Sequence, residues 1–396
     1  MAHTHPEIES QQAIPFWRDE RVINAFTQIV SAVLVIGFLV WVVINFIEAA
    51  SARGLALNFN FLNNPAGFPI SDSAIEYEST MSFSRAFLVG LLNTLRVSLL
   101  GIVVATILGT LVALARLSRN WLLSRIALVY IEFHRNIPLL VLLFIWYFTV
   151  FAQLPSVEEA MVFPGPMYLS QRGIYMTWPR LTETGGIFMV SVILGIVFAI
   201  IAFTILRRRR AVTGKETYYT PISLAILVVL PLIGWFASGG TPLYLDIPEK
   251  VGFNFHGGTR LTPEFAGLFV GLVMYTAGFI AEVVRAGIQA VNRGQVEAAN
   301  AVGLSYTQVL SLVIFPQALR VMIPPMISQY LNLTKNSSLA LLIGYQDVFS
   351  IGKIAINQAG RAVPVFAMVM ATYLTMSLIT SLILNIYNRR IQFIER

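Results

Sequence analysis

Apolar runs of about 20 residues recur along this chain, and no other feature constrains its fold as strongly. A helix rises about 1.5 Å per residue, so one such run crosses the ~30 Å hydrocarbon core of a bilayer. We place eight runs at residues 27–47, 86–114, 136–151, 187–206, 221–236, 265–288, 322–343 and 364–386. The sequence therefore predicts an all-α, polytopic membrane protein with about eight transmembrane helices.

Composition supports this class and excludes several others. The 396 residues are 56% hydrophobic and 12% charged, whereas soluble domains are about 25% charged. The chain has no cysteine, which excludes disulfides and thiolate metal sites, and its four histidines are scattered. It contains no phosphate-binding G-x-x-x-x-G-K-[ST] loop, no G-x-S-x-G elbow and no H-E-x-x-H pair. We expect a transport protein without enzymatic activity or cofactor.

The positions of the charges predict the orientation. The net charge of +7 comes from Lys and Arg residues between the apolar runs, which indicates topology determinants and not a nucleic-acid surface. Most of them fall on one side if both termini are cytoplasmic, with residues 1–26 as a tail and 27–47 as a retained anchor. The run Arg207–Arg210 is then a stop-transfer cluster, or alternatively a contact for anionic membrane lipid.

The stretch from Gln295 to Arg320 is a largely uncharged block between two apolar runs. Helix formers surround Glu297, Ala298 and Ala299, and Gly303 follows where a short helix would stop. Ser305 and Gln308 have the spacing of a capping box, and we expect Pro316 to end or kink the second helix. The pattern predicts two short helices joined by a sharp turn, a shape suited to docking into a partner.

This block resembles the loop of ABC-importer permease subunits, whose pattern is EAA, three residues, Gly, nine residues and Ile-x-Leu-Pro. Here Val313 and Phe315 stand for the Ile and the Leu, both mild apolar exchanges. We call residues 293–320 the EAA loop. The resemblance implies that it couples the chain to an ATPase, and the residues that match the family pattern are Glu297, Ala298, Ala299, Gly303 and Pro316.

The resemblance extends to about residues 86–152 and 264–390, which include EFHRNIPLL and GFIAEVVRAGIQAVNRGQ, and is to polar amino-acid ABC permeases. The long N-terminal anchor and the extra runs resemble the larger permease subunits of general L-amino-acid transporters. We therefore expect a type I importer core of five helices. The expected parts are 1–85 (tail, anchor and connector), 86–152 (first core part), 153–263 (inserted loops with two helices) and 264–396 (second core part).

The same resemblance implies the partners and the location. They are an ATP-binding cassette dimer, a second permease subunit, a periplasmic amino-acid-binding protein, an amino-acid substrate and membrane lipid, all at the bacterial inner membrane. An ion-gradient-driven secondary transporter of amino acids is the alternative from another class. It requires inverted repeats with broken helices at corresponding positions, and no such pair is apparent in the sequence.

Polar residues at membrane depth are the candidates for a substrate pathway. Lys335 lies near the middle of the predicted 322–343 span, where a charge is costly unless it faces protein or water. Its neighbours at helical spacing are Gln329, Asn332, Asn336 and Ser337. We expect these groups to meet the substrate carboxylate. The alternative is interhelical hydrogen bonding, with Lys335 paired to a carboxylate such as Glu282.

Two further helices offer polar groups. Tyr275 and Glu282 share one face of the 265–288 run, where Glu282 either meets the substrate ammonium or, as we favour, pairs with a cation such as Arg285. Arg96 stands in the outer third of the 86–114 run, where it either extends toward the interface or lines the pathway.

Overall fold

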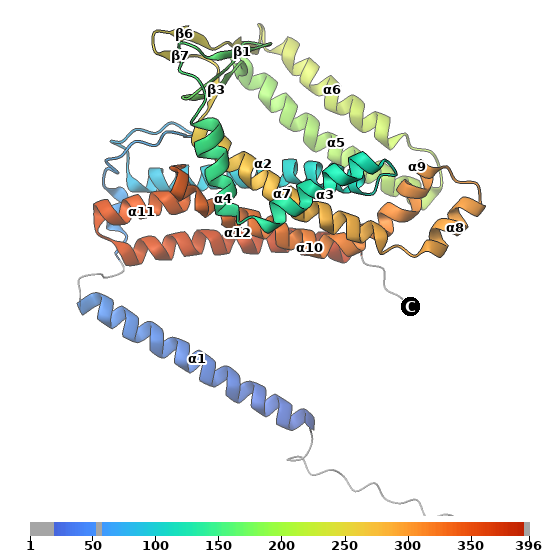
Figure 1. Cartoon of the computed structure of the whole chain (residues 1–396), viewed down its shortest axis with the longest axis horizontal. Helices are drawn as coiled ribbons and strands as arrows, with labels where there is room; N and C mark the ends of the chain where they lie inside the picture. The colour runs from blue at the N-terminus through green and yellow to red at the C-terminus, as the bar shows by residue number, and fades with distance from the viewer. Residues whose placement is uncertain (1–19, 53–57, 392–396) are drawn as a thin grey trace, which may run out of the picture.

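The structure is a computed structural model that describes residues 20–52 and 58–391 (Figure 1). Long helices dominate it. Their bounds are α1 (Glu20–Ala52), α2 (Phe83–Arg116), α3 (Trp121–Asn136), α4 (Leu139–Phe144), α5 (Gly185–Thr213), α6 (Tyr219–Ala237), α7 (Pro263–Gln289), α8 (Arg293–Ala301), α9 (Tyr306–Gln308), α10 (Phe315–Asn336), α11 (Val348–Ala359) and α12 (Ala362–Ile391). Shorter segments are η2 (Asn60–Asn63), the π-helical η3 (Ile145–Phe151) and η4 (Val309–Ile314), and the 3-10 segment η5 (Ser337–Ile343).

The helices confirm the predicted fold class. Within residues 20–52 and 58–391, seven helices are long and apolar enough to cross a membrane, and the bent pair made by α3 and α4–η3 is an eighth if it counts as one span. Residues 1–19 of the predicted tail (1–26) lie outside the described residues, and the rest of it is wrong, because residues 20–26 are the first turns of α1. In α1 the most apolar stretch has no buried residue, so this helix presents its side chains to its surroundings on every face.

The predicted span at 136–151 is wrong in its start and its shape. Asn136 is the last residue of α3, and the chain then turns by 108° before α4 and η3 continue. The turn lies at Ile137, whose ψ of 131° is extended because a following proline excludes the helical conformation. Pro138 therefore lies just before the helix and not in its first turn, as we had expected.

The core is built around α2 and α7, which lie side by side and are covered by α3, α4, α10 and α11 (Figure 1). Their close approach depends on a small residue at the contact. A Cβ added to Gly109 of α2 would stand 2.7 Å from Ile280 Cγ2 of α7. Small residues at such crossings allow membrane helices to pack backbone against backbone. Buried Ala105, Ala113 and Val284 complete this contact.

The 153–263 segment contains strands as well as two helices. Its strands are β1 (Met161–Phe163), β2 (Met167–Ser170), β3 (Gly173–Met176), β4 (Trp178–Leu181), β5 (Leu243–Asp246), β6 (Glu249–Val251), β7 (Asn254–His256) and β8 (Thr259–Leu261). They form a four-stranded antiparallel sheet in the order β1-β2-β3-β8 and two two-stranded antiparallel sheets, β4-β5 and β6-β7, of which only β6-β7 is a hairpin. We had expected loops here. Strand β3 pairs with β8, whose residues lie more than 80 positions later.

The helices α5 and α6 form a hairpin that stands beside the core (Figure 1). They pack closely on each other, and β4 and β5 pair at the base of the hairpin through Leu181 and Leu243. Because α7 starts directly after β8 and ends directly before α8, the strands and the EAA loop lie at opposite ends of the bundle.

Candidate functional site

The EAA loop has the local structure that its residues predict. Asn292 accepts a hydrogen bond from the Gly294 amide (2.8 Å) at the start of α8. After α8, Gly303 has a φ of +81°, the left-handed conformation of a helix stop. The Ser305 amide then donates to Gln308 Oε1 (2.9 Å), and the two residues form the predicted capping box.

The loop projects from the end of the bundle (Figure 1). Glu297 and Ala298 are exposed, whereas Ala299 is buried on the inner side of α8. Val302 is 77% and Tyr306 76% exposed. Two large apolar side chains are therefore exposed on this short protruding element.

We had predicted that Pro316 ends or kinks the second helix, and the first of these alternatives is wrong. The helix that begins at Tyr306 continues through η4 and α10 to Ile343, with Pro316 in the first turn of α10. The wider π-helical turn of η4 directly precedes Pro316, which lacks the amide hydrogen that an α-helical ladder uses. The second half of the EAA loop and the next span are therefore one continuous element.

The polar residues of α10 form a stripe that is open on the outside of this chain. Asn332 and Lys335 are exposed, Gln329 and Asn336 are half-buried, and Ser337 is buried with its hydroxyl donated to the Thr334 carbonyl (2.8 Å). Lys335 and Ser338 line a cleft of about 770 Å³ against α12. The neighbouring Leu333 packs on Gly101 in the middle of α2, which places Lys335 near the mid-level of that helix.

The structure does not bring Lys335 and Glu282 together. Glu282 accepts a hydrogen bond from Nε of Arg285 (3.0 Å), one turn along α7, which is the pairing that we favoured. Tyr275 is half-buried on the same helix, with its ring 4.9 Å from the ring of Phe279. The predicted pathway residues thus occupy separate places on α2, α7 and α10.

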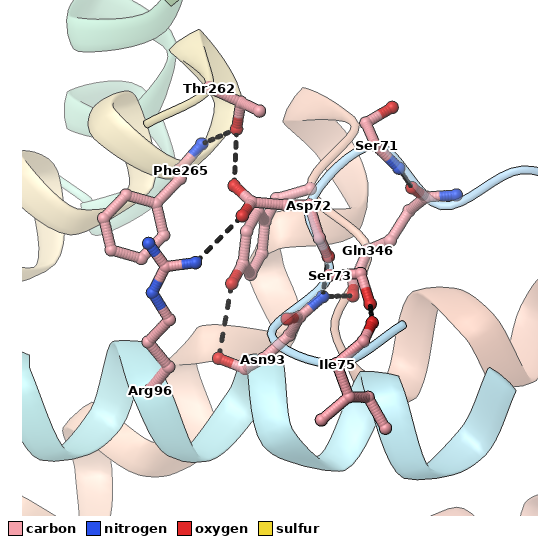
Figure 2. Close-up of polar contacts among 10 residues, drawn as sticks. Ser71, Asp72, Ser73, Ile75, Asn93, Arg96, Thr262, Phe265 and Gln346 are labelled. Carbon is pink, nitrogen blue, oxygen red and sulfur yellow. Dashed lines mark hydrogen bonds and ion pairs between the residues drawn. The ribbon is translucent and has the colours of Figure 1, made fainter. Parts of the chain in front are cut away.

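Arg96 has a specific counterion, shown in Figure 2. Its Nη1 donates to Asp72 Oδ1 (2.9 Å), and its guanidinium lies over the Phe265 ring at 4.5 Å. The other oxygen of Asp72 accepts from the Thr262 hydroxyl (2.8 Å), and Thr262 also caps α7 by accepting from the Phe265 amide. Arg96 is therefore held in place and does not extend freely toward the interface.

Asp72 belongs to a connector that the sequence analysis left without a role. Asn93 of α2 donates to the backbone carbonyls of Asp72 (2.6 Å) and Gln346 (2.9 Å), and the Ser71 amide donates to the Gln346 side chain (2.7 Å). Burial raises the pKa of Tyr77, whose protonated hydroxyl donates to the Phe68 carbonyl. One signal in the sequence could have pointed to this contact, because a cation such as Arg96 inside a membrane span requires a counterion.

Comparison with known proteins identifies the family. Residues 101–393 match the model of the binding-protein-dependent transport system inner membrane component. The chain is 43% identical to the general L-amino acid transport system permease protein AapQ of Rhizobium johnstonii, over 96% of this chain and 94% of that protein. It is 45% identical to the putative amino-acid ABC transporter permease protein YhdX of Escherichia coli, over 93% and 94%.

A third relative has a more specific name. The glutamate/glutamine/aspartate/asparagine transport system permease protein BztB of Rhodobacter capsulatus is 38% identical over 96% of each chain. These relatives are transport subunits and not enzymes, and they favour the ABC permease over the ion-gradient-driven alternative. The chain belongs to the binding-protein-dependent transport system inner membrane component family and is a multi-pass permease of an amino-acid ABC transporter.

Proposed function

We propose that the EAA loop is the surface through which an ATPase subunit drives this permease. The exposed Val302 and Tyr306, beside Glu297 and Ala298, are the observation that carries the proposal. The continuous helix from Tyr306 to Ile343 adds a mechanical argument. A movement of the docked loop would be transmitted toward Lys335 along this helix, which continues without a gap among the described residues through η4 and past Pro324 and Pro325.

Co-purification tests this coupling. Tagged protein extracted from its native membrane in mild detergent should bring down an ATPase and a second permease, with ATP hydrolysis stimulated by loaded binding protein. Glu297→Lys should reduce that stimulation while leaving membrane insertion intact, and Glu216→Lys, exposed in the turn between α5 and α6, is the matched control. Normal stimulation in Glu297→Lys would contradict the proposed docking.

The substrate pathway is proposed to run along the polar stripe of α10. Asn332 and Lys335 are exposed on one chain, and a lysine facing hydrocarbon in mid-membrane costs about 3 kcal/mol or more. A water-filled path shared with a second permease removes that cost, so we place the stripe at the contact between two permeases. Lys335 would then meet the carboxylate of the amino acid, and Gln329 and Asn336 would line the same path.

We assign the remaining partners to the two ends of the helix bundle. With both termini cytoplasmic, the EAA loop faces the cytoplasm and the strands face the periplasm, where an amino-acid-binding protein delivers its cargo. The core is proposed to comprise residues 86–152 and 264–396, and 153–263 to be an insertion. The packing of α5 mainly on α6 supports this division. The relatives named above support an L-amino acid as the cargo.

A further inference from the structure

A large cleft separates the connector from the inserted strands at the strand-bearing end of the bundle. Its volume of about 1060 Å³ is at the upper end of the roughly 300–1,000 Å³ of small-molecule sites. The lining includes Asp72, Ser73, Arg96, Trp178, Arg180 and Arg260. Three guanidinium groups and one carboxylate therefore face the same space.

The three arginines differ in how they are bound. Arg180 pairs with Asp246 (2.5 Å) and donates to the Gly258 carbonyl, and Arg260 donates to the Arg172 carbonyl (2.9 Å). All of these partners belong to the insertion itself. Arg96 instead rises from α2, and its counterion comes from the connector, so the Asp72–Arg96 pair is the one that joins two separate parts of the chain.

Further contacts hold both members of the Asp72–Arg96 pair in position, and both residues line the cleft. Asp72 is 8% exposed and fixed through its second oxygen by Thr262, while Arg96 is fixed by stacking on Phe265. The Arg96 side chain is 26% exposed. Among the described residues, Nη1 is its single hydrogen-bonded nitrogen, so its other donors are available to a ligand that enters the cleft.

We propose that this cleft binds the zwitterionic head of a free L-α-amino acid between Arg96 and Asp72, at the outer mouth of the permease. The ligand carboxylate would take the guanidinium of Arg96, and the ligand ammonium would take the carboxylate that Arg96 releases. This exchange leaves the net charge of the site unchanged. The Asp72–Arg96 pair is replaced by two ion pairs, one between Arg96 and the ligand carboxylate and one between Asp72 and the ligand ammonium. This inference rests on the proposed transport function and adds an outer recognition site to it.

The chemistry distinguishes this site from a general basic patch. A basic patch binds any anion, whereas insertion into an ion pair requires both charges of the ligand at once. L-Glutamine should therefore bind, whereas L-glutamine amide lacks the carboxylate and N-acetyl-L-glutamine lacks the ammonium. Each analogue leaves one charged partner unmatched, which should weaken binding roughly tenfold or more.

The natural absence of cysteine provides the assay. Ser73 is exposed and lines the cleft, so Ser73→Cys places one thiol beside the ion pair. The whole importer complex carrying this variant is put into nanodiscs, where both faces are accessible, and its rate of maleimide labelling is measured against each compound. Ser84→Cys, exposed at the start of α2 but outside the cleft lining, is the matched control.

L-Glutamine should slow labelling at position 73 and not at 84, and both analogues should require roughly tenfold higher concentrations. When Arg96→Gln is combined with Ser73→Cys, glutamine and its amide should protect position 73 from labelling equally well. Equal protection by all three compounds, or none by glutamine up to its solubility limit, would overturn the inference. ATP hydrolysis stimulated by loaded binding protein is measured in the same nanodiscs. Its loss would count against the proposed function, and its persistence without protection would count against the outer site alone.

Discussion

Substituting Gly303 tests the geometry of the EAA loop without disturbing its contacts. Its φ is +81°, and a Cβ built there meets no heavy atom within 4 Å. A valine therefore introduces no clash, and its cost is conformational. Holding an L-residue in the left-handed region costs about 1–2 kcal/mol, while asparagine tolerates it. That cost lowers the population of the docking-competent loop by roughly 5- to 30-fold.

The control for this substitution lies elsewhere in the chain. Gly214 ends α5 with a φ of +67°, and a Cβ there also meets open space. Gly214→Val thus has the same backbone cost outside the EAA loop. We expect Gly303→Val to lose most of the ATP hydrolysis that loaded binding protein stimulates, and Gly303→Asn and Gly214→Val to retain it. Equal losses in Gly303→Val and Gly214→Val, or normal stimulation in Gly303→Val, would refute the reasoning.

Three further predictions concern the membrane-embedded part. Lys335→Met removes one charged contact and should reduce amino-acid uptake about tenfold or more at normal expression. Lys353→Met on α11 is the control and should not reduce uptake. Normal uptake in Lys335→Met would exclude Lys335 from the pathway. Gly109→Leu should lower the melting temperature in detergent, because overpacking costs about 1–3 kcal/mol, while Gly37→Leu on α1 should leave it unchanged. Replacing residues 183–241 with Asn-Gly should join β4 to β5 as a hairpin and leave a folded core; aggregation on size-exclusion chromatography would show that the core depends on the removed helices.

Local signals in the sequence predicted local structure well. The turn at Gly303 and the capping box of Ser305 and Gln308 depend on residues within one or two helical turns, so their spacing was sufficient. The Glu282–Arg285 pair is also local, at i and i+3 on α7. The two prolines were harder to interpret. Pro138 lies at a 108° bend, whereas Pro316 lies within a continuous helix. The π-helical segment before Pro316 accommodates a residue that has no amide hydrogen to donate.

The strands and the counterion of Arg96 were not predictable in this way. Strands β1 and β6 are three residues long and fully exposed, so they lack the alternation of buried and open residues that marks a strand. Asp72 lies 24 positions from Arg96 in a polar connector, and helical periodicity does not extend into a loop. The requirement for a counterion was predictable, but its identity was not.

The class of protein, the position of most spans and the turn at Gly303 could all be predicted from the amino-acid sequence. The bilayer sets the length of an apolar helix, and helix caps depend on a few neighbouring residues. Short stretches of sequence are therefore sufficient to predict both features. What each helical face contacts depends instead on how the helices pack together. Periodicity places Asn332 and Lys335 on one side of α10, but the packing of Leu333 on Gly101 decides that this side is open. Likewise, Asp72 reaches Arg96 only because the connector folds over the N-terminal parts of α2 and α7.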